Sequence, residues 1–154
     1  MSKITNDQEF KKVLAPLSLP QQRLVAALFA ENVLALVKDF RIEQAIAVAK
    51  NPQATAEERD SAYKTAKAAS VERFTQCGRD ADWGQQAGHF VAEAVVTSVT
   101  PETKLAADDN LAWNAAMHAR MARTCETISG GQGTENAESQ QQYQILEDFL
   151  ATQS

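Results

Sequence analysis

A chain of 154 residues with 44% hydrophobic and 23% charged residues has the composition of one soluble globular domain. It contains no apolar run of about 18 residues, so no membrane-spanning helix and no membrane contact are expected. Its first residues lack the apolar core of a secretory signal, and two cysteines are too few for a disulfide framework. We therefore expect a cytoplasmic protein.

The net charge of −5 is concentrated at the C-terminal end of the chain. Five of the 20 acidic residues lie in residues 126–154, which contain no lysine or arginine, whereas residues 1–125 carry 15 acidic and 15 basic side chains. Nucleic-acid-binding proteins carry a basic stripe, and this sequence has none, so no nucleic-acid partner is expected. The acidic end suits a basic protein partner, or it serves solubility alone.

The first two predicted helices are separated by prolines. A short helix begins at an N-cap, either Thr5 or Asn6, and must end before Pro16. Pro20 occupies the tolerated first turn of a second helix, which the apolar pattern continues through residue 37. This second helix is apolar on nearly every side, which is typical of the middle of a bundle.

The third and fourth helices show apolar residues on one face. The third has one narrow stripe, made of Ile42, Ala45, Ile46 and Ala49. Thr55 and Glu58 have the spacing of a capping box at the start of the fourth. Its expected inner face is Tyr63, Ala66, Ser70, Phe74 and Cys77. Gly78 is a natural stop, and the many alanines predict closely packed helices.

The fifth and sixth helices also follow caps. Asp80 or Asp82 caps the fifth, whose expected core stripe is Trp83, Ala87, Phe90, Val91, Ala94 and Ser98. A Thr–Pro pair at 100–101 closes it. Asp109 or Asn110 begins the sixth, and the clearest predicted core stripe follows, made of Trp113, Met117, Met121, Thr124 and Ile128.

The end of the chain predicts a linker and one more helix. Residues 129–139 are rich in glycine and polar residues, which favours a flexible linker. Residues 140–154 form an amphipathic helix that docks on the bundle of residues 1–128 or on a neighbouring chain. No segment alternates with a period of two. The prediction is an all-α, single-domain bundle of six or seven helices.

Three polar residues stand out inside apolar helices. His89 and Glu93 form an i, i+4 pair on the side of their helix away from the main stripe. They are either a solvent-exposed pair or a polar spot that lines a cleft or meets a partner. Glu31 falls in an apolar quadrant with Leu24 and Leu28, where a carboxylate needs a partner. Candidate partners are Arg59, Arg73, Arg120 and His89.

The sequence offers no recognisable metal or phosphate site. Cys77, His89, His118 and Cys125 have the chemistry of metal ligands, but no zinc-site spacing joins them. Buried cysteines are better explained as small apolar residues. The glycines at 130–131 follow a helix and lack the G-K-[ST] of a phosphate loop. We expect no metal and no cofactor.

Three segments together carry a family resemblance: AENVL at Ala30–Leu34, RIEQAI at Arg41–Ile46 and AGHFVA at Ala87–Ala92. With the Ala-rich helix between them, they resemble all-helical immunity proteins of bacterial polymorphic-toxin systems, over about residues 23–123. The chain departs from that family before the third helix, where an acidic–basic–proline run is reduced to residues 39–41.

This resemblance implies a protein that binds and neutralises a cognate toxin and is not an enzyme. It also implies that Glu31, Arg41 and His89 form one polar cluster. The leading hypothesis is a non-enzymatic binding protein with a protein partner, such as a basic toxin domain. One alternative is a small-molecule-binding or enzymatic bundle with a pocket around Glu31 and His89. Another is an oligomeric scaffold, a homodimer through the C-terminal helix.

Overall fold

The computed structural model describes residues 3–77 and 82–153, which form seven α-helices, two short 3-10 helices and no β-strand. The elements are α1 (Asp7–Leu14), α2 (Leu19–Asn32), η1 (Leu34–Leu36), α3 (Phe40–Lys50), α4 (Ala56–Cys77), α5 (Trp83–Val99), η2 (Glu102–Lys104), α6 (Leu111–Ser129) and α7 (Glu138–Thr152). None of these helices combines the length and the apolar composition needed to cross a membrane. The predicted all-α bundle is confirmed.

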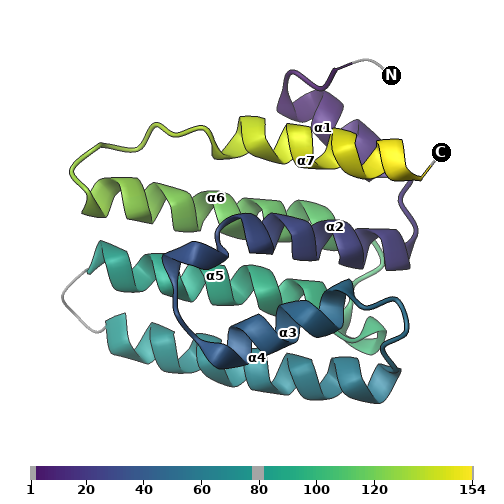
Figure 1. The fold of residues 1–154 in the computed structure, drawn as a ribbon, viewed down its shortest axis with the longest axis horizontal. Helices are drawn as coiled ribbons and strands as arrows, with labels where there is room; N and C mark the ends of the chain where they lie inside the picture. Colours follow the sequence, from purple (N-terminus) through teal and green to yellow (C-terminus); the bar gives the residue numbers. More distant parts are fainter. Residues whose placement is uncertain (1–2, 78–81, 154) are drawn as a thin grey trace.

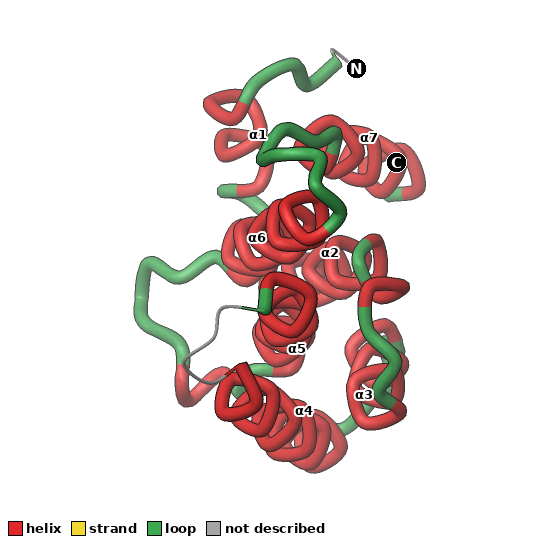
Figure 2. The backbone as a smooth tube through the Cα atoms, turned by 90° about the vertical axis from the view of Figure 1, so that its left-hand side faces the viewer, coloured by secondary structure: helices red, strands yellow, loops and turns green. Residues whose placement is uncertain are grey.

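The helices are stacked in layers (Figures 1 and 2). Helices α1 and α7 form one outer layer, α2 and α6 lie beneath them, and α3 and α4 form the opposite outer layer. Helix α5 lies at the centre and packs against α2, α3, α4 and α6. Helix α2 contacts α3, α5, α6 and α7, which confirms the interior position predicted from its apolar surface.

Several helices begin at caps that the sequence predicts. Asn6 caps α1, and its side chain accepts a hydrogen bond from the first turn. Ser18 and Gln21 form a reciprocal capping box at α2. Thr55 and Glu58 form another at α4, with hydrogen bonds of 3.0 and 3.1 Å. These contacts satisfy backbone donors that a helix start leaves unpaired.

The caps of α5 and α6 are Asp82 and Asn110. Asp80, the alternative cap of α5, and Gly78, the predicted end of α4, lie outside the described residues. Helix α2 ends at Asn32, because the chain turns into the 3-10 segment η1. The prediction of one helix through residue 37 is therefore wrong.

The core around α5 is built largely from small side chains. Its buried alanines come from α2, α3, α4, α5 and α6: Ala27, Ala30, Ala45, Ala49, Ala62, Ala66, Ala69, Ala92, Ala94, Ala119 and Ala122. Larger buried residues fill the space between these contacts, among them Ile42 and Ile46 of the predicted α3 stripe. Small side chains at the contacts let the helix axes approach closely, as the alanine content predicts.

Three predicted core residues instead face solvent. Phe74, Trp83 and Met121 are 67%, 40% and 48% exposed. On α6 the buried face carries alanines and not the predicted stripe of large residues: Ala112, Ala115, Ala116, Ala119 and Ala122. The closely packed interior of the bundle accepts only small side chains there, so the larger ones lie at its edges.

A second core joins the ends of the chain to the bundle. The buried Phe10 of α1 packs its ring against Phe29, Trp113 and Tyr143, with centroids 5.2–6.0 Å apart. Helix α7 lies on α2 and α6 of its own chain, with Tyr143, Leu146 and Phe149 buried. The amphipathic C-terminal helix thus buries its apolar face within the single chain.

The predicted linker is shorter than expected. Helix α6 continues to Ser129 and α7 already begins at Glu138. Between them, Gly131 and Gly133 have φ of 74° and 78°, a backbone conformation that favours glycine. The Asn136 side chain holds the segment, because its amide donates to the Thr124 hydroxyl at 3.3 Å and its oxygen accepts from the Glu138 backbone at 3.1 Å.

Candidate functional site

His89 and Glu93 form the predicted i, i+4 pair on α5, with His89 Nε2 3.8 Å from Glu93 Oε1. The pair does not project freely into solvent, because both residues contact Ser70 of α4. The Ser70 hydroxyl donates to Glu93 Oε1 at 2.6 Å, and His89 Nδ1 lies 3.1 Å from the Ser70 carbonyl oxygen. A carbonyl only accepts, so this contact places the proton on Nδ1. The pair therefore links α4 to α5, which rules out a solvated surface pair.

The surroundings of Ser70 differ from those of a serine nucleophile. A nucleophilic serine donates its proton to a histidine nitrogen and exposes its oxygen to substrate. Here the Ser70 hydroxyl donates to the carboxylate of Glu93, and Ser70 is fully buried. The His89 ring lies between the rings of Phe74 and Phe90, at 5.4 and 5.3 Å. This arrangement holds α4 against α5.

His118 on α6 is close enough to interact electrostatically with this pair. Burial is the main reason that the pKa of His118 lies below its ordinary value of 6.5. Glu93 acts against this shift, while His89 and Lys67 add to it. His118 was not singled out as a partner of His89 from the sequence, because helical spacing alone does not relate two different helices.

Because its pKa is lowered on folding, His118 binds a proton more readily in the unfolded chain. Its contribution to stability is therefore complete above pH 6.5 and is lost as the pH falls below that value. We expect urea unfolding between roughly pH 7.5 and 5.5 to show a smaller loss of stability in His118→Gln than in the wild type. Equal losses in the two proteins would contradict this assignment.

Arg41, predicted as a site residue, lies in an ion-pair network between α3 and α4. Its guanidinium contacts Asp39 at 3.0 Å and Glu72 at 2.9 Å. Arg73 contacts the same Asp39 carboxylate at 3.3 Å. Burial acts to raise the pKa of Asp39, but hydrogen bonds from Arg41 and Arg73 outweigh it and lower that pKa. The network fixes Arg41 in position and leaves its side chain 37% exposed.

Gly88 allows Arg73 to reach this network. A Cβ atom at Gly88 would lie 2.9 Å from the Arg73 guanidinium and 3.3 Å from Val37. The glycine in the AGHFVA segment is thus explained by a close approach between α4 and α5. Arg41 is linked through Asp39 to Arg73, which lies against the residue preceding His89. Two of the three residues of the expected polar cluster therefore lie at neighbouring contacts of α4, Arg41 where α4 meets α3 and His89 where α4 meets α5.

Glu31 does not lie at these contacts of α4, and the expectation that it is buried is wrong. Its side chain is 42% exposed and pairs with Lys50 of α3 at 2.7 Å. The proposed partners contact other groups, such as Asp7 for Arg120 and Asp39 for Arg73. The apolar quadrant assigned to Glu31 is a partly exposed side of α2, since the helix is buried mainly on its other faces.

Among the described residues, Glu138 has a fully buried carboxylate, and the sequence places it in the predicted linker. Its carboxylate is fully buried and contacts Arg123 Nε at 3.1 Å and Asn32 Nδ2 at 2.8 Å. Arg123 also donates to the Asn32 carbonyl at 3.3 Å. The three residues come from α7, α6 and the end of α2, so spacing along one helix gives no sign of them.

Four apolar side chains are exposed in the segments around this ion-pair network. They are Phe40, Val71, Phe74 and Trp83, which are 40–70% exposed, and we call them together the exposed apolar surface. These residues begin α3, end α4 and begin α5, helix ends that lie toward the same end of the bundle (Figure 1). Beside it, a groove of about 440 Å³ between α3 and α4 is lined by Arg41 and small residues such as Ala45 and Ser61.

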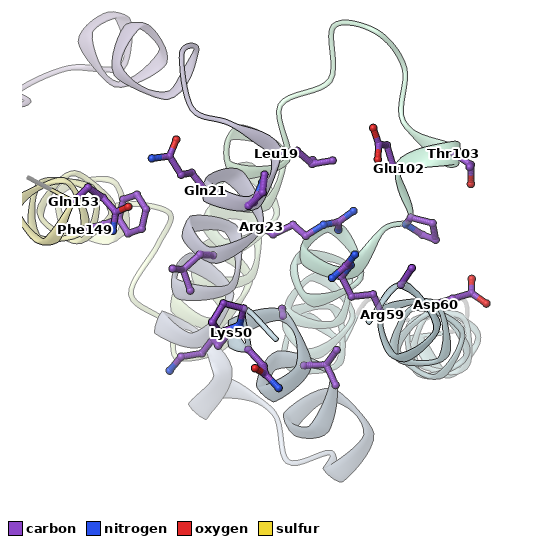
Figure 3. Close-up of a pocket in the computed structure, with 18 residues that line it drawn as sticks. Leu19, Gln21, Arg23, Lys50, Arg59, Asp60, Glu102, Thr103, Phe149 and Gln153 are labelled. Atoms are coloured by element: carbon purple, nitrogen blue, oxygen red, sulfur yellow. The ribbon is translucent and has the colours of Figure 1, made fainter. Parts of the chain in front are cut away.

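A larger pocket of about 910 Å³ lies elsewhere, where α2, the end of α3, the start of α4 and η2 meet (Figure 3). Neither Glu31 nor His89 lines it. Neither this pocket nor the groove between α3 and α4 corresponds to the pocket expected around those two residues. Three basic residues do line the larger pocket: Arg23, Lys50 and Arg59.

Comparison of the chain with family models, with curated proteins and with solved structures finds no match.

Proposed function

We propose that this chain is a non-enzymatic, cytoplasmic binding protein of the immunity type, which neutralises a cognate toxin. The observation that carries the proposal is the exposed apolar surface beside Arg41. Aromatic residues and arginines dominate the energetics of protein interfaces. Most of the surface of Phe40 and Phe74 is exposed to water, and a bound partner would bury it.

Preorganisation of Arg41 supports the same proposal. Its guanidinium is held by two carboxylates, so little side-chain entropy would be lost on binding. The His89 ring also packs against the Phe74 ring and helps to hold it in place. In this proposal the polar residues of the cluster hold the surface in shape, while Phe40, Phe74 and Arg41 make the contacts with the partner.

The charge of the chain favours a basic partner. The net charge of −5 attracts a cationic protein at long range and repels nucleic acid. A basic toxin domain is the partner that the resemblance and the charge both favour. A second function, binding of a small ligand, is favoured by the pocket at Arg23 and is treated separately below.

Co-expression with a candidate toxin, taken from a toxin-like reading frame beside the gene, tests this function. We expect the wild type to restore growth and the double variant Phe40→Ser/Phe74→Ser to fail, with an affinity lowered by roughly a hundredfold. Met121→Ser, which removes an exposed apolar side chain from α6, is the matched control and should protect fully. Urea unfolding verifies that each variant stays folded.

Two results would overturn the proposal. One is the absence of any toxin-like reading frame beside the gene. The other is full protection by the folded double variant, because the exposed apolar surface would then have no part in binding.

A further inference from the structure

The pocket of about 910 Å³ contains a buried arginine, Arg23, that forms no ion pair with an acid of the described residues. Arg23 of α2 is only 8% exposed, and its guanidinium donates to the backbone carbonyl of Ser98 at 3.3 Å. Among the described residues, no acidic side chain lies within ion-pair distance of it. A guanidinium has five N–H donors, so most of the binding capacity of Arg23 is left to the pocket.

A second arginine faces the same space. Arg59 of α4 lines the pocket, and its guanidinium donates to the Ala54 carbonyl at 2.8 Å. Figure 3 shows the side chains of Arg23 and Arg59 converging from opposite walls. Each arginine is oriented by a backbone carbonyl, and neither forms an ion pair in the described part of the chain.

The like charges of Arg23 and Arg59 repel each other. Burial, and then the positive charge of Arg59, lower the pKa of Arg23, while Glu102 at the rim acts against this. Folded proteins rarely contain a buried cation without a counter-charge, because removing a charged group from water is costly. In this pocket the half-buried Arg59 faces the buried Arg23, and an anion between them would offset the repulsion and accept hydrogen bonds from both guanidinium groups.

The rest of the lining combines apolar and polar residues. Leu19, Leu24, Val48 and Phe149 contribute apolar side chains, and the acids Asp60 and Glu102 also line the pocket. Glu102 is close enough to Arg23 to act on its pKa. The volume is within the range of small-molecule sites, which are mostly apolar with a few polar groups that fix the ligand. The lining thus suits a molecule with one anionic end and an apolar body.

We propose that this pocket binds a small organic oxyanion, a phosphate monoester or a carboxylate, whose charged group lies between Arg23 and Arg59. Planar guanidinium groups donate pairs of parallel hydrogen bonds to both kinds of oxyanion. The apolar body of the ligand lies against Leu24 and Val48. This site is separate from the exposed apolar surface, so either can fail without the other.

Phenyl phosphate, benzoate and inorganic phosphate are the probes that test the site, at constant ionic strength with sodium chloride as the reference. We expect phenyl phosphate or benzoate to raise the Tm of the wild type and to bind in isothermal titration. In Arg23→Gln and in Arg59→Gln the affinity should fall roughly tenfold or more. Lys38→Gln removes one positive charge from an exposed position outside the pocket and should bind as the wild type does.

The probes also distinguish the two kinds of head group. Tighter binding of phenyl phosphate identifies a phosphate ester, and tighter binding of benzoate identifies a carboxylate. Three results overturn the proposal: no response to either probe beyond that to chloride, equal binding by Arg59→Gln and the wild type, or binding of inorganic phosphate as tight as that of phenyl phosphate. Because Arg59 is less buried than Arg23, its variant remains informative if Arg23→Gln fails to fold.

Discussion

Replacing Glu138 with alanine is expected to lower the free energy of unfolding by about 3 kcal/mol. The change removes the carboxylate that neutralises Arg123 and that accepts from Asn32, so a guanidinium is left unpaired at the junction of α2, α6 and α7. We place the loss at the lower end of the range for buried pairs, because the Arg123 side chain keeps 24% exposure. Urea unfolding measures this difference directly.

Two further variants separate lost charge pairing from other causes. Glu135→Ala removes an exposed acid from the same segment and should change stability by less than about 0.5 kcal/mol. The double variant Arg123→Met/Glu138→Leu removes both charges and should recover much of the loss, since no buried charge then lacks a partner. A stability of Glu138→Ala equal to that of the wild type would contradict the role given to this pair.

Replacing Phe10 with alanine is expected to cost about 3–5 kcal/mol. Phe10 is fully buried, and its ring contacts Phe29, Trp113 and Tyr143. The guanidinium of Arg120 also lies 5.5 Å from this ring. The substitution would leave a cavity between α1, α2, α6 and α7 and remove most of the apolar anchoring of the short helix α1. Thermal or urea unfolding provides the measurement.

Phe40→Ala is the matched control for this change, because it removes the same atoms from a position that is 70% exposed. It should alter stability by no more than about 0.5 kcal/mol. Similar losses at Phe10 and Phe40 would show that α1 does not anchor to the core in the way described.

The sequence predicts local features of this fold well. The caps at Asn6, Thr55 and Asn110 are formed by residues within three positions of the backbone groups they satisfy. Burial on a particular helix face is harder to predict, since it depends on the volume available between helices. Met121 and Phe74 are apolar but too large for the alanine-lined contacts, and hydrophobicity alone does not reveal that.

Polar contacts within one helix are likewise easier to predict from the sequence than polar contacts between helices. The spacing of His89 and Glu93 predicts their mutual contact, but not the contact of both with Ser70 on another helix. Glu31 resembles a buried acid on a helical wheel, yet Glu138 is the buried one. Its partner Asn32 lies 106 positions away in the sequence, and only the tertiary fold relates the two.

Amide hydrogen exchange of the chain, alone and bound to the toxin proposed as its partner, tests most directly whether the exposed apolar surface is the binding site. Slower exchange in the complex is expected at the start of α3, the end of α4 and the start of α5, around Phe40, Phe74 and Trp83. Protection confined to α1 and α7, with no change at these three helix ends, would contradict it.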